Sequence, residues 1–236
     1  MKLLRSELFV FFVVLGSLVG CCAKPAAPTE PPPKIRVACV GDSITQGVGA
    51  ERGRSYPAQL QELLGKHWEV GNFGVSGRTL LRKGDHPYLK ERAFKKAQAF
   101  NPNVVIIMLG TNDTKIGNWR YKADFAKDYS DLIKTFLALK TRPKVYICRP
   151  IPVFGNGLGA INEAALQEQM PILDQLAQQL PVGIIDMHAA LAGHAETVPD
   201  NVHPSTEGAA LMARAASKVL LKAFSATQIA AEKAAP

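Results

Sequence analysis

The sequence predicts an α/β domain in which a five-stranded, mostly parallel sheet lies between two layers of helices. Apolar, strand-like runs alternate with helical segments along the chain, which is the pattern of a parallel sheet covered on both faces. The run VVIIML at Val104–Leu109 is continuously apolar, as expected for a parallel strand buried on both sides. Small and polar residues follow each run. In such sheets ligands bind beyond the carboxyl ends of the strands, so a site is predicted there.

Each element is predicted from its own pattern. The apolar residues of Lys122–Lys140 recur at helical spacing on one face. In the helix at Glu163–Leu180, Pro171 lacks an N–H, so a bend or restart is expected there. The predicted strands are Ile35–Val40, Trp68–Phe73, Val104–Leu109, Lys144–Cys148 and Val182–Ile185, and the other predicted helices are Tyr56–Leu64 and Glu207–Phe224.

Residues 1–20 have the order of a secretory signal peptide, namely a basic start, an apolar stretch and small residues. The apolar stretch is shorter than the roughly 20 residues of a membrane span. Residues 21–33 are rich in proline and are predicted to form an extended tether. The folded domain is then expected at 34–224, followed by a flexible tail at 225–236.

The segment Leu18-Val19-Gly20-Cys21 resembles a bacterial lipoprotein box. The resemblance implies cleavage before Cys21 and attachment of lipid to its thiol, which would hold the protein on a membrane. The alternative is plain secretion with an incidental thiol. The prediction is therefore an exported periplasmic or cell-envelope lipoprotein.

The formal net charge is +8, but the basic residues are scattered and not interleaved with aromatic residues. A nucleic-acid surface is therefore not predicted, whereas affinity for an anionic lipid or polysaccharide stays open. Cys39 and Cys148 lie in apolar runs without a CxxC pattern, so we expect buried free thiols and no zinc site. No cofactor or metal is predicted, and the sequence does not predict an oligomeric state.

Ser43 follows the first strand in Gly41-Asp42-Ser43 and opens a short helix, where it is either an N-cap or a nucleophile. A nucleophilic serine needs a base with an orienting acid. His203 follows Asp200 by three residues, so one turn brings both side chains together. His188 follows Asp186 by two and is the weaker alternative, because side chains two apart in a strand diverge.

Ester hydrolysis also requires donors for the oxyanion. Gly74 allows close approach of its backbone N–H, and Asn112 offers its side-chain amide. Each residue has a plainer interpretation, since both residue types are also common in turns. Their positions after the second and third strands favour a shared site.

Four blocks together resemble the SGNH branch of the GDSL esterase/lipase family, whose members have a flavodoxin-like three-layer α/β/α fold. The resemblance implies that Ser43, His203 and Asp200 form a catalytic triad. It further implies an oxyanion hole made by the amides of Ser43 and Gly74 and the side chain of Asn112. The blocks are Gly41-Asp42-Ser43, Gly74 in NFGVSG, Gly110-Thr111-Asn112-Asp113 and Asp200-Asn201-Val202-His203.

The stretches RTLLRKGDHPY and GTNDTKIGNW resemble bacterial carbohydrate O-acetylesterases. Arg78, Tyr88 and Trp119 are therefore candidate substrate contacts, with packing under the loop as the alternative for Trp119. The leading hypothesis is a serine esterase that removes short acyl groups, chiefly acetyl, from a carbohydrate. A lysophospholipase or thioesterase-like acylhydrolase is the second hypothesis, and a non-catalytic glycan-binding lipoprotein is the alternative of another class.

Overall fold

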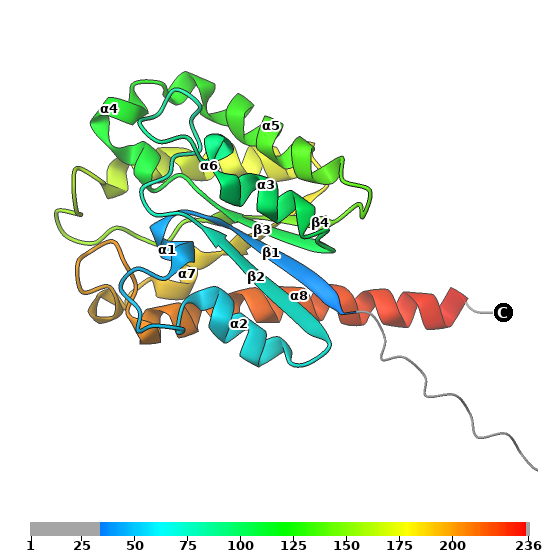
Figure 1. Ribbon diagram of the computed structural model, residues 1–236. Helices are drawn as coiled ribbons and strands as arrows, with labels where there is room; N and C mark the ends of the chain where they lie inside the picture. The colour runs from blue at the N-terminus through cyan, green and yellow to red at the C-terminus, as the bar shows by residue number, and fades with distance from the viewer. Residues whose placement is uncertain (1–33, 235–236) are drawn as a thin grey trace, which may run out of the picture. The chain divides into compact units, whose positions relative to one another are not determined.

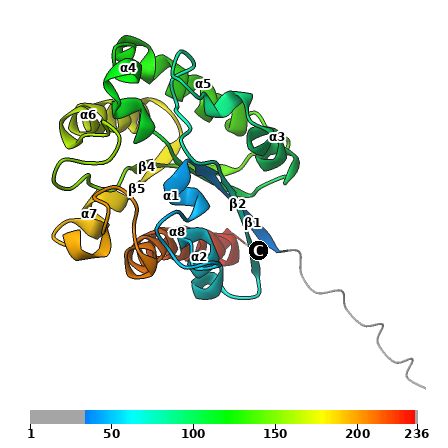
Figure 2. The same ribbon diagram turned by 60° about the vertical axis from the view of Figure 1, so that its left-hand side comes forward.

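The computed structural model describes residues 34–234, and beyond residue 225 it describes only the backbone of the last helix. The predicted signal peptide, Cys21 and the tether lie outside the described residues. The sheet has the order β2-β1-β3-β4-β5, and every neighbouring pair is parallel (Figures 1 and 2). The strands are β1 (Ile35–Gly41), β2 (Trp68–Gly74), β3 (Val104–Met108), β4 (Lys144–Arg149) and β5 (Val182–Asp186).

Helices cover both faces of this sheet, as predicted. Helices α2, α7 and α8 pack on one face, and α3, α5 and α6 pack on the other (Figures 1 and 2). The longer helices are α2 (Tyr56–Leu64), α3 (Arg92–Ala99), α5 (Phe125–Leu137), α6 (Glu163–Gln179) and α8 (Thr206–Ala234). The short ones are α1 (Ser43–Gln46), α4 (Ile116–Trp119) and α7 (Met187–Leu191), with 3-10 turns at Tyr88–Lys90, Asn112–Thr114, Lys122–Asp124 and Ala195–Thr197.

The apolar run of β3 supplies both cores. Val104, Ile106 and Met108 face the α2/α8 side, while Val105 and Ile107 face the α3/α5/α6 side. All five are at most 1% exposed. Because successive side chains of a strand point to opposite faces, a continuous apolar run is what a doubly covered central strand requires.

One helix extends further than the sequence predicts, and a second helix lacks one of the two features expected at its proline. Helix α8 continues to Ala234, so the backbone is helical over most of the segment for which a flexible tail from residue 225 was predicted. The alanine-rich composition there has high helix propensity, which explains the continuation. Helix α6 runs through Pro171 as one helix and is not restarted; the proline is exposed, so its ring faces away from the core.

Helix α3 at Arg92–Ala99 was not predicted. Its sequence RAFKKAQA contains only a few apolar residues, and Ala97 is its only fully buried one, so the helical period is weak in the sequence. The helix covers β2 through tertiary packing, with Phe100 at its end packing edge-on against Phe73. Among the described residues no helix is long and apolar enough to cross a membrane.

Candidate active site

Ser43 is the first residue of α1, directly beyond the carboxyl end of β1. The Oδ1 atom of Asp42 accepts the backbone N–H of Ile44 at 3.0 Å and so caps this helix. Asp42 is therefore the N-cap of α1, which is the structural role that the sequence left open for Ser43. The Ser43 side chain is left to point elsewhere, and the residue is only 5% exposed.

The hydroxyl of Ser43 contacts a histidine that is 160 residues away in the sequence. Its Oγ lies 2.9 Å from Nε2 of His203, and the other ring nitrogen, Nδ1, lies 2.7 Å from Oδ2 of Asp200. A carboxylate only accepts hydrogen bonds, so the proton belongs on Nδ1 and Nε2 accepts from the serine hydroxyl. This tautomer is the one that a general base requires.

The loop that carries His203 is held by Asp200 itself. The Oδ1 atom of Asp200 accepts the backbone N–H of His203 at 2.6 Å and that of Val202 at 3.0 Å. Burial by itself raises the pKa of Asp200, but these bonds and the bond from the ring of His203 lower it in sum. Asp200 is therefore ionised at neutral pH and both positions and orients the imidazole.

The three predicted oxyanion donors differ in whether they already donate a hydrogen bond within the protein. No acceptor among the described residues takes the N–H of Ser43, which stands at the free start of α1. The N–H of Gly74 donates to Oδ1 of Asn72 at 2.9 Å. The side-chain amide of Asn112 donates to the carbonyl of Arg78 at 3.2 Å and, at 3.4 Å, to Oδ2 of Asp42.

Gly74 is needed where it stands because another backbone segment passes over it. A Cβ atom at this position would lie 2.2 Å from the backbone nitrogen of Gln46 and 2.7 Å from the carbonyl carbon of Thr45. The end of β2 therefore lies against α1, the helix that begins with Ser43. Close packing, and not an unusual φ angle, is what selects glycine here.

Two buried carboxyl groups lie beside the site. Asp113 accepts the backbone N–H groups of Leu80 and Leu81 at 2.9 and 2.7 Å, and Asp42 caps α1. Burial is the largest effect on both and raises each pKa to about 7. Both residues therefore hold backbone segments in place beside Ser43 and Asn112.

Sequence reasoning missed two asparagines that support the site. Asn72 donates to the carbonyl of Thr45 at 2.8 Å and accepts from Gly74, so it joins β2 to α1. Asn118 donates to the carbonyl of Asn112 at 2.9 Å and fixes the loop that presents it. Asn72 lies two residues before Gly74 in NFG, but the residue type alone does not reveal such long-range contacts.

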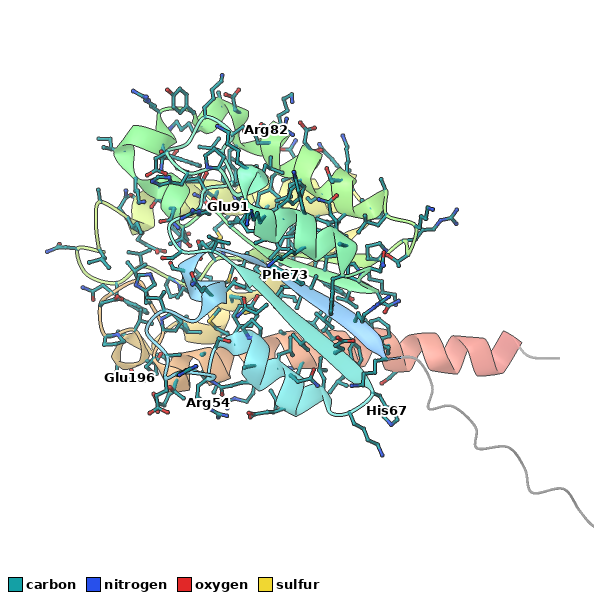
Figure 3. The ribbon with its side chains drawn as sticks, viewed as in Figure 1. Arg54, His67, Phe73, Arg82, Glu91 and Glu196 are labelled. Carbon is teal, nitrogen blue, oxygen red and sulfur yellow. The ribbon has the colours of Figure 1, made fainter. Side chains whose placement is uncertain are left out.

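Tyr88 was wrongly predicted as a substrate contact, since it is fully buried and its hydroxyl donates to the carbonyl of Phe73 at 2.7 Å. Its ring is part of the core under the loop, which a polar surface sequence could not reveal. The Arg78 side chain forms an ion pair with Glu91 at 2.8 Å and donates a hydrogen bond to the carbonyl of Ser76. Phe73 and Glu91 are labelled in Figure 3 at the carboxyl end of β2 and the start of α3.

Trp119 also lies mainly inside the protein, with 9% of its surface exposed. Its ring packs edge-on against Phe125, and its Nε1 donates to Glu168 at 3.1 Å. The structure therefore favours the packing interpretation over a stacking platform for sugars, because so little of the indole is exposed.

The alternative pair Asp186 and His188 does not form an acid–imidazole contact. Asp186 caps α7 by accepting the N–H of Ala189 at 2.8 Å and pairs with Arg149. His188 instead has its Nε2 2.8 Å from Glu163. Of the two predicted acid–histidine pairs, only Asp200 and His203 form an acid–imidazole contact, and this pair lies beside Ser43.

Comparison with known families agrees with this geometry. Residues 39–211 match the GDSL-like lipase/acylhydrolase family. The chain belongs to that family. The match includes all four sequence blocks and the residues that the fold gathers at the carboxyl edge of the sheet. The predicted family is thereby confirmed.

Among curated proteins, an acetylxylan esterase of Xylanibacter ruminicola is 41% identical to this chain over 206 residues. The alignment covers 78% of this chain but only 43% of that protein, so the chain spans less than half of its relative. Solved structures share the fold. A carbohydrate acetylesterase family member from Sinorhizobium meliloti has TM-score 0.62 at 22% identity, covering 78% of this chain and 96% of its own. The aryl esterase of M. smegmatis has TM-score 0.62 at 22% identity, with 79% and 98% covered.

Proposed function

We propose that this acylhydrolase is a serine esterase that removes short acyl groups, chiefly acetyl, from a carbohydrate. The observation that carries the proposal is the continuous contact from Ser43 through His203 to Asp200, with ring nitrogens at 2.9 and 2.7 Å from their partners. The printed name of the 41% identical relative, an acetylxylan esterase, supports the substrate class.

In the first step, Nε2 of His203 takes the hydroxyl proton as Oγ of Ser43 attacks the ester carbonyl. The imidazolium that forms stays beside the ionised Asp200, which stabilises its positive charge. The tetrahedral intermediate then collapses, His203 returns the proton to the leaving sugar oxygen, and the acyl group remains on Ser43.

In the second step, water loses a proton to Nε2 of His203 and attacks the acyl-enzyme, releasing the acid and restoring the Ser43 hydroxyl. Both steps place negative charge on the former carbonyl oxygen. The free N–H of Ser43 is ready to stabilise it. Gly74 and Asn112 would exchange their present bonds to Asn72 and Arg78 for bonds to this oxygen, consistent with catalytic hydrogen bonds that tighten only in the complex.

The surroundings of the site favour a polar substrate over a long acyl chain. A cavity beside Asn112 is lined by the charged groups of Lys83, Asp85, Lys115 and Arg120. An acyl chain of a lysophospholipid would require apolar walls, because burying charged groups against hydrocarbon is unfavourable. The lysophospholipase hypothesis is therefore second to the carbohydrate ester.

The test is hydrolysis of an aryl acetate, a long-chain aryl ester and an acetylated xylo-oligosaccharide by the wild type and by Ser43→Ala. We expect cleavage of both acetates, and a loss of kcat by a factor of about 10³ or more in the variant. Thermal unfolding of both proteins controls for folding. Faster cleavage of the long-chain ester would favour the lysophospholipase hypothesis instead.

The same measurements address the non-catalytic alternative. If the wild type hydrolyses none of the three substrates, the proposal is wrong. Binding of the oligosaccharide without hydrolysis would then support a glycan-binding lipoprotein. Such a protein would have no need for the contacts among Ser43, His203 and Asp200.

We propose further that the chain is exported and anchored to a membrane through lipid on Cys21. The support is the sequence Leu18-Val19-Gly20-Cys21 with its preceding apolar stretch. Cell fractionation of the wild type and of Cys21→Ala tests this, and the variant should move from the membrane to the soluble fraction. A variant that stays in the membrane fraction would refute the anchor.

A further inference from the structure

A cavity of about 400 Å³ lies at the carboxyl edge of the sheet, next to the candidate active site. Its volume is in the range of small-ligand sites. Three segments form its walls, namely the loop between β2 and α3, the segment with α4, and the loop between β4 and α6. The lining residues are Lys83, Asp85, Lys115, Ile116, Gly117, Asn118, Arg120, Gly159 and Ala160.

Hydrogen bonds join this cavity to the residues of the site. Asn118, in its wall, donates to the carbonyl of Asn112 at 2.9 Å, and Asn112 carries the candidate oxyanion donor. On the opposite wall, Asn162 donates to the carbonyl of Thr114 at 2.9 Å and holds the end of the loop that contains Ala160. A sugar chain whose acyl group lies at Ser43 would therefore extend over or beside this cavity.

The lining is predominantly cationic. Lys83, Lys115 and Arg120 carry three formal positive charges against the single negative charge of Asp85. Asp85 stays ionised: burial raises its pKa, but the bonds from Asn118 and the charge of Lys115 lower it in sum. Lys115 pairs with Asp85 at 3.5 Å, so the excess positive charge of the lining lies on Lys83 and Arg120.

Arg120 is the cation most available to a ligand. Its guanidinium lies 4.6 Å from the ring centroid of Tyr121, and it has no carboxylate partner among the residues that the structure describes. Lys83, by contrast, pairs with Asp124 at 2.8 Å. Beside Arg120, the side chain of Ile116 is 84% exposed and offers an apolar surface at the rim.

We propose that this cavity is a substrate subsite for a uronic acid residue, a sugar that carries a carboxylate, on the polysaccharide that is deacylated at Ser43. Arg120 binds the carboxylate and Lys115 adds charge, while the C–H face of the sugar packs on Ile116. This inference rests on the proposed function. It extends that function from neutral acylated sugars to an acidic polysaccharide.

A carboxylate fits better than other groups for two reasons. The planar guanidinium of an arginine matches a carboxylate through two parallel hydrogen bonds. A neutral sugar would gain little from the Arg120 guanidinium, whose burial beneath it would be unfavourable without a counter-charge. Asp85 limits the bound charge, because a second anion placed near it would be repelled.

The experiment compares two acetylated xylo-oligosaccharides of equal length, one of which carries a single uronic acid branch. The ratio of kcat/KM for the acidic over the neutral substrate is measured with the full chain at low salt. We expect the wild type to favour the acidic substrate by about three- to tenfold, chiefly through KM, which is typical of one partly exposed charged contact. The preference should weaken as salt screens the charges.

The variant Arg120→Gln should bring the ratio close to one. Lys140→Gln is the matched control, because it removes the same charge from an exposed residue between α5 and β4, away from the carboxyl edge. It should leave the ratio unchanged. A wild-type ratio of one, or an equal ratio in Arg120→Gln and the wild type, would overturn the subsite.

Failure of the proposed function has a different signature, namely that neither oligosaccharide is hydrolysed. Calorimetric binding of the acidic oligosaccharide to Ser43→Ala, with and without Arg120→Gln, then decides the subsite alone. Weaker binding in the double variant supports the cationic cavity. Equal binding, or none, refutes it.

Discussion

At the scale of single residues, Asn112 has a side chain with two competing tasks. Its amide now donates to the carbonyl of Arg78 and to Asp42, yet the proposed mechanism requires it at the oxyanion. Asn112→Ala should lower kcat by a factor of about 10²–10³ with little change in KM, because this contact strengthens only in the transition state. Steady-state kinetics on an aryl acetate measure it. An unchanged kcat would exclude Asn112 from the oxyanion site.

Asp113 predicts a pH dependence of stability. Burial raises its pKa from near 3.8 to about 7, although the N–H groups of Leu81 and Leu80 counteract part of the shift. The folded state then holds a proton that the unfolded state releases near pH 4. The stabilisation from this proton is complete below pH 3.8 and is lost as the pH rises towards 7.

Urea unfolding of the wild type and of Asp113→Asn between pH 4 and 8 measures this contribution. The asparagine does not titrate, so its free energy of unfolding should fall less steeply with pH, by up to about 1.4 kcal/mol per pH unit at most. The variant loses some stability at every pH, because its NH₂ group faces a backbone donor. Identical slopes in the two proteins would show that Asp113 does not titrate in this range.

At the scale of elements, the contact between the end of β2 and α1 sets the position of Ser43. Gly74→Ala would bring a Cβ atom to within 2.2 Å of the backbone nitrogen of Gln46, so α1 has to move. We expect a loss of about 1–3 kcal/mol in stability, as for other overpacked contacts, and a fall in kcat.

The matched control for this change is Gly117→Ala in α4, where no atom lies within 4 Å of the added Cβ and the φ angle is ordinary. Thermal unfolding and aryl acetate hydrolysis are measured for both variants. Gly117→Ala should keep its stability. A Gly74→Ala protein with wild-type activity would mean that α1 adapts without displacing Ser43.

Elements also differ in how far the sequence predicts them. The bounds of α2 and the starts of all five strands agree with the sequence prediction. Apolar runs bounded by polar or turn residues indicate such strands, and apolar residues at helical spacing indicate a helix. Helix α3 and the continuation of α8 were missed. Tertiary packing determines α3, and the helix propensity of alanine determines the end of α8. Neither segment has an apolar pattern that would reveal a helix from the sequence.

At the scale of the whole molecule, the strand order separates two cysteines. Cys39 is on β1 and Cys148 is on β4, with β3 between them, and both are free and buried. Two strand spacings amount to about 10 Å, beyond the reach of a disulfide. Burial raises the pKa of Cys39 to about 12 and also raises that of Cys148, so both thiols should react slowly in the folded protein.

Alkylation followed by peptide mapping tests this arrangement. Both cysteines should be protected in the folded chain and fully labelled after unfolding without a reductant. Failure of both to react in the unfolded, unreduced protein would indicate a disulfide and contradict the strand order.

The sequence by itself predicted the fold class and the family, and it singled out Ser43, Asn112, Asp200 and His203 as candidate site residues. These depend on local patterns: apolar runs specify the strands, and short polar blocks follow them. The tertiary structure alone decided which of the predicted contacts exist. The fold places Ser43 against His203, which is 160 residues away in the sequence. It also lets the N–H of Gly74 donate to Asn72 and buries Tyr88 in the core. It also gathered the cations around Arg120 from separate loops. Local sequence does not predict such contacts, because they form only when the strand order brings distant loops to one edge of the sheet.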